Sequence, residues 1–311
     1  MKKVELHVHL DGSLSPIYAK KLLGYDVSKE MIGNNSHGLK DYLEKFSLPI
    51  SLLQDENNIE EFSYLLGKDL EKDDVIYAEV RFCPLLHVEK LEPDQVIAAV
   101  LRGFRKVSTV KVNLILCMMR NFSFEKNKKI IDLVEKHLGH GVCGIDLAGD
   151  EAHYKTRDFK ELFSIIRDKD IPCTIHAGEA DSYKSVDDAI SFGAKRIGHG
   201  IHSIESFQTI SQLIKKDIIL EVCPTSNLDT SIIHSMEEHP IKKLHEFGVK
   251  ITINTDNRTV SHTSLEQEYQ LLKETFDFGD QDFLQFNLNA IDGAFLSQIE
   301  KDELKAKLLK G

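Results

Sequence analysis

The sequence predicts a single α/β domain over residues 1–311, folded as a (β/α)8 barrel, or TIM barrel. Short β-like runs, each followed by a helix-like stretch, recur along the whole chain, and this alternation is the signature of a parallel sheet. Eight runs favour a closed barrel over an open sheet. The runs cover residues 3–10, 75–82, 112–119, 142–148, 171–176, 195–199, 218–223 and 250–254. The candidate catalytic and metal-binding residues lie at the ends of these runs, and this position also supports the fold.

The first run carries two histidines, His7 and His9, in the sequence Glu5-Leu6-His7-Val8-His9-Leu10-Asp11-Gly12. Side chains of a strand alternate between its faces, so the two imidazoles point to one side and the apolar residues between them to the other. Two neutral imidazoles next to a turn can supply two of the ligands of a metal site. Taken alone, the pair is more often explained by packing, because surface and core histidines two apart are common.

The stretch 11–74, between the first two runs, is too long for a simple βα connection and is predicted to be a helical insertion. Ser15-Pro16 has the form of an N-cap with proline at the first helical position. Further on, Leu39, Tyr42, Leu43 and Phe46 have the spacing of one helix face. This face either packs in the core or lies over the barrel mouth as an apolar lid, since a βα loop emerges on the side where barrel enzymes work.

Helix signals continue in the second half of the chain. Ser185-Val186-Asp187-Asp188 resembles a capping box, and Gly193 resembles a helix stop before the sixth run. Residues 280–311 are predicted to form additional helices packed on the outside, with alternating charges that make a solvated face.

Composition limits the classes of function. The chain has 39 Lys and Arg against 50 Asp and Glu, and this formal charge of -11 argues against a nucleic-acid partner and against a highly anionic substrate. The five cysteines are widely spaced in apolar runs, so we expect buried thiols in a reducing cytoplasm. A secretory leader is not expected because Lys2 and Lys3 lead straight into a strand, and a membrane span is not expected because no apolar run is long enough. The sequence leaves the oligomeric state undetermined.

Histidines and carboxylates collect at the ends of five runs. They lie in His7-Val8-His9, Asp146-Leu147-Ala148-Gly149-Asp150-Glu151, His176-Ala177-Gly178-Glu179, Gly198-His199-Gly200 and Asn254-Thr255-Asp256-Asn257. In a parallel barrel these ends converge on one face, and four histidines and an aspartate on one rim are not explained separately by packing. Three imidazoles with a carboxylate and no thiolate suit Zn2+ at a catalytic site, for which Fe2+, Mn2+ or Co2+ could compete.

These segments, together with Cys223-Pro224-Thr225-Ser226-Asn227, resemble the adenosine deaminase family of the amidohydrolase superfamily, in its bacterial branch. The resemblance runs in order from residue 3 to about 260. It implies a (β/α)8 barrel with one zinc ion per subunit, which hydrolyses the 6-amino group of adenosine, and of 2′-deoxyadenosine, to give inosine-type products and ammonia.

The resemblance also implies a role for each site residue. His7, His9, His176 and Asp256 would bind zinc, with water completing the shell. Glu179 would carry a proton to purine N1, and His199 would orient and polarise the water. Asp11 would bind the ribose 5′-hydroxyl, Gly149 would donate its N–H to N3, and Leu39, Tyr42, Leu43 and Phe46 would form an apolar wall. Independently of the family, Glu179 must be protonated to act as an acid, so we expect surroundings that raise its pKa.

One position departs from the animal members, which carry two aspartates and a proline after Asn-Thr. This chain has Asp256-Asn257-Arg258 instead. The resemblance places Asn257 against purine N7, an acceptor to which its amide can donate without an added proton. Alternatively, Asn257 only caps a turn.

Other functions are open to the same sequence. Adenine, methylthioadenosine or another 6-aminopurine could be the substrate, although the family associates aspartate at position 11 with nucleosides and glutamate with adenine. AMP is disfavoured because no basic phosphate cradle is evident. Another amidohydrolase of this fold, or a catalytically silent barrel that binds purines, would share the framework. The Pro-Cys-x-x-Cys signature of cytidine deaminases is absent.

Overall fold

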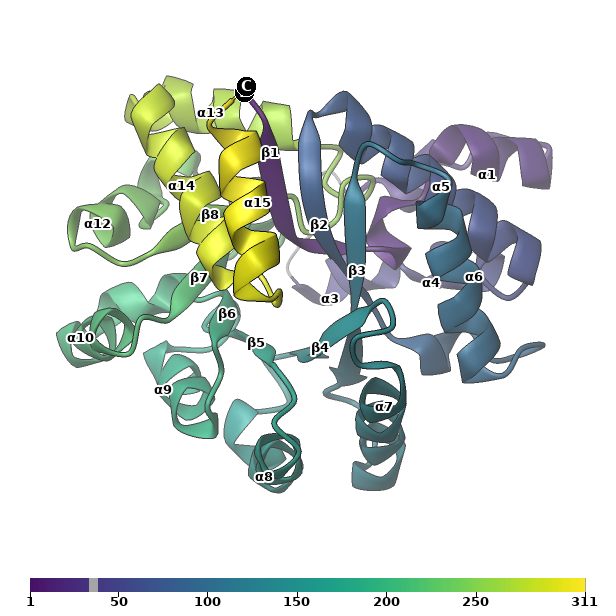
Figure 1. The fold of residues 1–311 in the computed structure, drawn as a ribbon, viewed down its shortest axis with the longest axis horizontal. Coiled ribbons are helices and arrows are strands. Elements are labelled where there is room, and N and C mark those ends of the chain that lie inside the picture. Colours follow the sequence, from purple (N-terminus) through teal and green to yellow (C-terminus); the bar gives the residue numbers. More distant parts are fainter. Residues whose placement is uncertain (34–38, 311) are drawn as a thin grey trace.

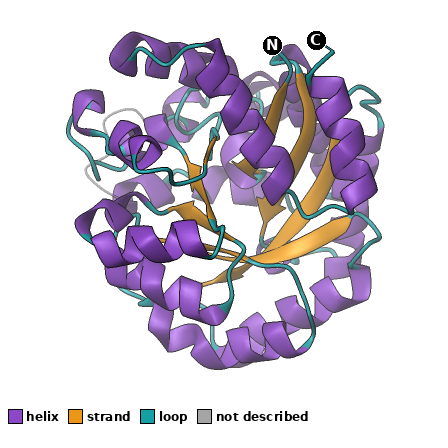
Figure 2. Cartoon of the chain, turned by 60° about the vertical axis from the view of Figure 1, so that its left-hand side comes forward, coloured by secondary structure: helices purple, strands orange, loops and turns teal. Residues whose placement is uncertain are grey.

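Eight parallel strands form a closed barrel with helices around it (Figures 1 and 2). The computed structural model describes residues 1–33 and 39–310, apart from the side chains of residues 39–41. The strands are β1 Lys3–His9, β2 Val75–Phe82, β3 Lys111–Met119, β4 Val142–Ala148, β5 Thr174–Ala177, β6 Arg196–His199, β7 Ile219–Val222 and β8 Ile251–Ile253. All eight predicted runs are confirmed as strands, within a few residues at each end.

The barrel closes through two single bridges. Strands β1 to β4 and β5 to β8 form two four-stranded sheets in chain order. A parallel bridge between Ile145 and Cys173 joins β4 to β5, and a second between Val8 and Asp256 joins β1 to the end of β8. Strands β5 to β8 have only three or four residues each, so few ladder bonds are available at the two seams.

The strands alternate with helices, as predicted. The helices are α1 Pro16–Leu23, α2 Ser28–Met31, α3 Leu39–Glu44, α4 Ser47–Leu52, α5 Glu56–Lys72, α6 Pro93–Arg105, α7 Phe124–His137, α8 Lys160–Asp168, α9 Tyr183–Phe192, α10 Phe207–Lys215, α11 Pro224–Asp229, α12 Ile241–Glu246, α13 Leu265–Phe276, α14 Asp280–Gly293 and α15 Gln298–Leu308. Among them, none has the length and apolarity that crossing a bilayer requires.

The helical insertion is shorter than residues 11–74. Its last helix, α5, packs along α6 and against β2, so it belongs to the outer ring of the barrel. The remaining helices, α1 to α4, make up the additional part of the first βα connection. The predicted cap at Ser15 is confirmed, because its Oγ accepts the N–H of Tyr18, and Pro16 opens α1.

The predicted capping box at Ser185 is wrong. Helix α9 begins at Tyr183, two residues earlier, and Ser185 is buried inside its first turns. Its hydroxyl contacts the side chains of Glu151 and Thr156, so a tertiary contact has replaced the local cap that the pattern indicated. Gly193 does end α9, with a left-handed φ of +94°.

The two C-terminal helices do more than cover the outside. The N–H of Val4 donates to Asn287 Oδ1 (2.8 Å), and Asn289 Nδ2 donates to the carbonyl of Ile251 (2.9 Å), so α14 is bonded to both β1 and β8. Figure 1 shows α14 and α15 in front of the strands. The turn between them places Phe295 over the Arg196 guanidinium, 3.8 Å from it, at the amino-terminal end of the barrel.

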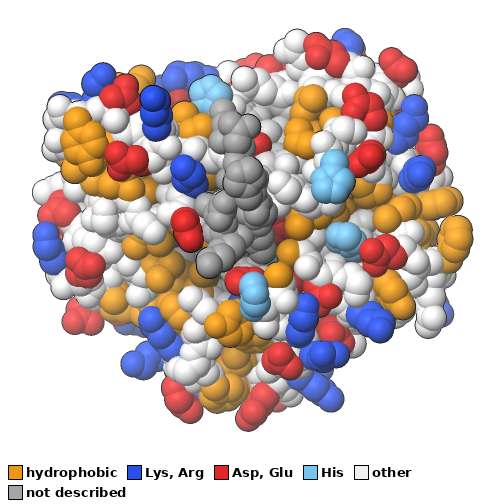
Figure 3. All heavy atoms as spheres, turned by 180° about the vertical axis from the view of Figure 1, so that it is seen from behind, with side chains coloured by type: hydrophobic (Ala, Val, Ile, Leu, Met, Phe, Trp, Pro, Cys, Tyr) orange, Lys and Arg blue, Asp and Glu red, His pale blue; other side chains and the backbone are white. Residues whose placement is uncertain are grey.

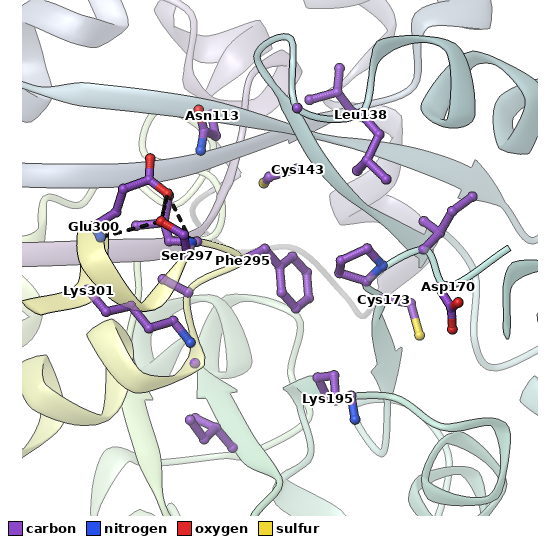
Figure 4. Close-up of a pocket in the computed structure, with 18 of the residues that line it drawn as sticks. Asn113, Leu138, Cys143, Asp170, Cys173, Lys195, Phe295, Ser297, Glu300 and Lys301 are labelled. Atoms are coloured by element: carbon purple, nitrogen blue, oxygen red, sulfur yellow. Dashed lines mark hydrogen bonds between the residues drawn. The ribbon is translucent and has the colours of Figure 1, made fainter.

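A hollow of about 1,100 Å³ lies at this amino-terminal end (Figure 4). Its lining includes Asn113, Cys143, Phe295 and Glu300. The described residues that line it include no histidine, so none of the predicted metal ligands is there. The candidate chemistry belongs to the opposite end of the barrel.

Glu221 is the centre of an ionic cluster inside the barrel. Its carboxylate accepts from Arg81 Nη2 (2.8 Å) on β2, from Arg196 Nε (2.5 Å) on β6 and from Thr174 Oγ1 (3.0 Å) on β5. Arg196 also donates from Nη2 to Glu79 (2.5 Å), and all four charged side chains are fully buried. Burial by itself raises the pKa of Glu221, but the charges of Arg81 and Arg196, together with His7, hold that pKa well below its usual range.

We expect Arg196→Met to lower the free energy of unfolding by about 3–5 kcal/mol, because Glu221 and Glu79 would stay buried without one of their cations. Urea unfolding of the metal-free protein measures this change. The matched control is Lys128→Met, which removes the exposed ion pair with Asp132 and should change the free energy of unfolding far less. An Arg196→Met protein as stable as this control would contradict the role given to the cluster.

Candidate metal and catalytic site

The predicted metal ligands converge at the carboxyl-terminal end of the barrel. Among the described residues, ligand atoms of His7, His176, His199 and Asp256 all lie within 4.8 Å of one another. His9 adjoins this group, with its Nε2 3.2 Å from Nε2 of His176 and 3.4 Å from Oδ1 of Asp256. Strands β1, β5 and β6 and the end of β8 supply these five side chains. The sequence prediction that they share one rim is therefore confirmed.

Two of the imidazoles are oriented by buried carboxylates. His7 Nδ1 lies 2.9 Å from Glu221 Oε2, and His176 Nδ1 lies 2.8 Å from Asp146 Oδ2. The contact of His7 is a hydrogen bond, and a carboxylate can only accept, so Nδ1 of His7 carries the hydrogen and Nε2 keeps its lone pair. His7 Nε2 is buried and has no hydrogen-bond partner. Its lone pair is therefore free for a cation.

Asp256 links the site to barrel closure. Its backbone N–H donates to the carbonyl of His7 (2.9 Å), and its carbonyl accepts from the N–H of His9 (2.7 Å). Its Oδ2 accepts from Ser226 Oγ (2.6 Å), which leaves Oδ1 facing the Nε2 atoms of His7 and His9 at 3.3 and 3.4 Å. Asp256 has a left-handed φ of +58°, a strained conformation that these contacts maintain.

The residues present fit a divalent metal ion. The cluster combines imidazole nitrogens with one carboxylate oxygen and no thiolate, and ligands of this kind suit Zn2+, Fe2+, Mn2+ or Co2+. The unpartnered His7 Nε2 is an orphaned buried polar atom that a cation would satisfy. Carboxylates behind two of the histidines complete the usual outer shell of such a site.

Glu179 lies beside the cluster, in surroundings that raise its pKa as the sequence predicts. Its side chain is 7% exposed, and its Oε2 lies 3.6 Å from His199 Nε2. Burial, and then the negative charges of Asp256 and Glu151, raise the pKa of Glu179 well above its usual value. The expected raised pKa is confirmed, and it favours the protonated form that a proton donor requires.

Glu151 holds the loop that carries Glu179. Its Oε1 accepts the N–H of Gly178 (2.7 Å), and its Oε2 accepts the N–H groups of Glu179 (2.9 Å) and Ala180 (2.8 Å). Gly178 has a φ of +68°, which lets three consecutive N–H groups turn toward one carboxylate. The sequence motif contains Glu151 but does not indicate this role, because the partners of Glu151 are 27 to 30 residues away.

A pocket of about 420 Å³ opens next to the cluster. Its lining includes His9, His176, His199, Glu179 and Asp256. Tyr42, Leu43 and Phe46 line the same pocket, so the apolar face from the insertion reaches the barrel mouth. Leu39 begins α3, but its side chain lies outside the described part of the chain. Six apolar lining residues were not singled out from the sequence as pocket residues, because nothing distinguishes them from core: Ile50, Phe82, Cys83, Leu86, Cys117 and Met119.

The predicted substrate-binding residues also lie in this pocket, where Asp11, Gly149 and Asn257 are among its lining. Asn257 Nδ2 donates to Tyr42 Oη (3.0 Å), so its side chain bonds the pocket wall rather than capping a turn. A methyl group at Gly12 would come within 1.9 Å of Asn257 Oδ1, which explains why glycine stands there. Asp11 has an unpredicted neighbour, His87, whose Nε2 lies 3.1 Å from its carboxylate.

Comparison with known proteins decides the family. The sequence profile described as adenosine deaminase matches residues 2–310. The chain belongs to the adenosine deaminase family. An adenosine deaminase of Clostridium perfringens strain SM101 is 38% identical over 326 residues, covering 99% of this chain and 98% of the relative.

Solved structures support the barrel fold of this member of the adenosine deaminase family. Adenine deaminase from Arthrobacter aurescens aligns with a TM-score of 0.90 at 19% identity, over 99% of this chain and 98% of that chain. A zinc-bound amidohydrolase from Burkholderia ambifaria aligns with a TM-score of 0.88 at 22% identity, over 100% and 90%. At these identities the similarity concerns the fold alone, and it agrees with the predicted (β/α)8 architecture.

In this adenosine deaminase family member, we expect Glu151→Gln to lower the free energy of unfolding by about 2–3 kcal/mol, because an amide cannot accept all the N–H groups that the carboxylate now accepts. We also expect a lower kcat, since the loop that positions Glu179 would lose its anchor. Chemical unfolding and steady-state kinetics measure the two effects. Glu205→Gln is the matched control, because Glu205 accepts the N–H of Tyr183 at the surface. Equal effects of the two substitutions would contradict this role.

We expect Glu179→Gln to lower turnover by about 10²–10⁴-fold, because the proton donor is lost. The same substitution should stabilise the metal-free protein at pH 7 and above. A carboxyl group whose folded pKa exceeds its unfolded value loses folding free energy as the pH rises from about 4.5 through the folded pKa, and glutamine does not titrate. Unfolding curves from pH 4 to 9 test this, and a parent protein with the same pH dependence as the variant would contradict the raised pKa.

Proposed function

We propose that this protein catalyses the zinc-dependent hydrolytic deamination of adenosine and 2′-deoxyadenosine, releasing ammonia, as a step of purine salvage. The main support is one observation. A carboxyl group with a raised pKa, Glu179, and a cluster of metal-ligand type open into the same pocket. The family membership and the curated adenosine deaminases at 37–39% identity agree with this reaction.

In this proposal His7, His9, His176 and Asp256 hold the zinc ion. When bound, zinc supplies a water that is acidic enough to attack at neutral pH. Glu179 donates its proton to N1 of the purine, which makes C6 electrophilic toward the attacking water. His199 donates a hydrogen bond from Nε2 to the oxygen that attacks and so stabilises the negative charge that develops.

The remaining pocket residues bind the nucleoside in this proposal. Asp11 accepts the ribose 5′-hydroxyl, and His87 Nε2 lies 3.1 Å from this carboxylate. The N–H of Gly149 faces N3, and the second amide hydrogen of Asn257 is available for N7 because the first goes to Tyr42. Leu39, Tyr42, Leu43 and Phe46 form the apolar wall, and the helices of the insertion act as a lid that excludes water from the reaction.

Charge in the pocket favours a nucleoside over a nucleotide. The described lining residues include three aspartates, Asp11, Asp150 and Asp256, besides Glu179, but neither lysine nor arginine. A phosphate group would meet negative charge and find no guanidinium to pair with. Acidic and basic side chains are interspersed on the face in Figure 3, which supports the absence of a nucleic-acid partner. The five buried free thiols support a cytoplasmic location.

The test is the ultraviolet spectrum of zinc-loaded protein mixed in parallel with adenosine, 2′-deoxyadenosine, adenine, methylthioadenosine and AMP. We expect rapid conversion of the two nucleosides, loss of activity after chelation and recovery with zinc. Restoration by Fe2+, Mn2+ or Co2+ in parallel samples identifies the preferred metal.

If only adenine or methylthioadenosine were converted, the proposed mechanism would stand but the proposed substrate would be wrong. If no purine changed its spectrum although metal was bound, the protein would be a silent purine-binding barrel or a different amidohydrolase.

A further inference from the structure

The histidines of the site differ in what their Nδ1 atoms face. His7 and His176 face carboxylates, Glu221 and Asp146, which can only accept a hydrogen bond. His199 Nδ1 faces the side-chain amide of Asn227 instead, with 3.0 Å between Nδ1 and Nδ2. An amide nitrogen can only donate, so the imidazole of His199 must accept at Nδ1. Its hydrogen is then on Nε2, the opposite arrangement to that of His7 and His176.

The direction of this hydrogen bond is set by a backbone group. At the start of α12, the N–H of Ile241 donates to Nδ1 of His239 (3.1 Å). A backbone N–H is always a donor, so His239 Nδ1 has no hydrogen and Nε2 must carry it. His239 Nε2 lies 3.2 Å from Asn227 Oδ1 and donates to it. The Asn227 amide is therefore oriented with its NH2 group toward His199.

The reverse orientation of the Asn227 amide is excluded chemically. With the amide turned over, its NH2 group would face His239 Nε2 and require that nitrogen to accept. His239 would then have to accept at both ring nitrogens, and a neutral imidazole always carries one hydrogen. We call the chain of hydrogen bonds from Ile241 through His239 and Asn227 to His199 the relay. Donors and acceptors can be assigned along the relay in only one way.

The environment keeps the relay in this state. Asn227, His239 and His199 are all buried, so water does not compete for these bonds. Burial lowers the pKa of His239 to about 3, which keeps it neutral over the working pH range. Asn227 lies on α11, directly after β7, and His239 lies just before α12, so two separate segments of the connection from β7 to β8 meet behind His199.

We propose that Asn227 and His239 are positioning residues that fix His199 as its Nε2–H tautomer, so that it donates a hydrogen bond at the active site and does not act as a metal ligand. This inference deepens the proposed function and rests on it. The proposal gives His199 a different role from that of His7 and His176, although all three belong to one tight cluster. An imidazole with hydrogen on Nε2 has no lone pair there for a cation, whereas it suits an oxygen that gains negative charge.

The first test reads the tautomers directly. Two-bond 15N–1H correlation spectra of the zinc-loaded protein, labelled at histidine and assigned by single substitutions, report which ring nitrogen carries hydrogen. We expect Nε2–H for His199 and His239, and Nδ1–H for His7 and His176. A hydrogen on Nδ1 of His199 would overturn the proposal. Because no substrate is present, this result is independent of which purine the enzyme converts.

The second test breaks the relay at Asn227. The substitution Asn227→Asp replaces the donor with an acceptor of the same shape, so we expect the hydrogen of His199 to move to Nδ1. The kcat should fall by about 10²-fold, with zinc content and KM little changed. Asn287→Asp is the matched control, since Asn287 is a buried amide at the other end of the barrel. It should leave the His199 signals unchanged.

Variants of His239 show whether the relay or the packing is responsible. Glutamine can reproduce both bonds of His239, accepting from Ile241 with Oε1 and donating to Asn227 with Nε2, whereas leucine can reproduce neither. We expect His239→Gln to keep the Nε2–H signal of His199 and most of the activity, and His239→Leu to lose both. Unchanged His199 signals and kcat in both Asn227→Asp and His239→Leu would overturn the proposal.

Discussion

The orientation of two histidines of the site depends on one buried guanidinium. Arg81 donates from Nη1 to Asp146 (2.9 Å) and from Nη2 to Glu221 (2.8 Å), and these two carboxylates orient His176 and His7. Each carboxylate is fully buried, and the cation beside it favours its ionised form, which can only accept hydrogen bonds. A single arginine on β2 therefore fixes the ring orientation of two candidate ligands that lie on β1 and β5.

The strand pairing that closes the barrel also brings residues of the site together. The bridge that joins β1 to the end of β8 runs through the backbone of Asp256, between the carbonyl of His7 and the N–H of His9. Three predicted ligands are thus brought together by the last pairing of the barrel. His199 and Asp256 both have left-handed backbones, and the hydrogen bonds of the folded barrel are what hold these strained residues at the pocket.

Residues behind the pocket divide the histidines into two chemical kinds. A histidine whose Nδ1 faces a carboxylate has a lone pair on Nε2. A histidine whose Nδ1 faces an amide NH2 group has a hydrogen on Nε2. Glu151 works in the same indirect way on Glu179, since it holds the backbone of its loop and adds a negative charge that favours the protonated form. None of these supporting groups needs to touch the substrate to set how the site residues act.

The sequence alone determined the strands, the pair His7 and His9, and the residues at the strand ends, because alternation along a strand and the convergence of parallel strands follow from local geometry. The family resemblance added the roles of those residues. Tertiary structure decided the partners: Glu221 meets His7 across 214 positions, and Glu151 meets Glu179 across 28. It also overrode the local capping pattern at Ser185 and made α14 part of the barrel wall. Hydrogen bonds between distant residues have no periodicity in the sequence, so only the folded chain shows which nitrogen of each histidine is free.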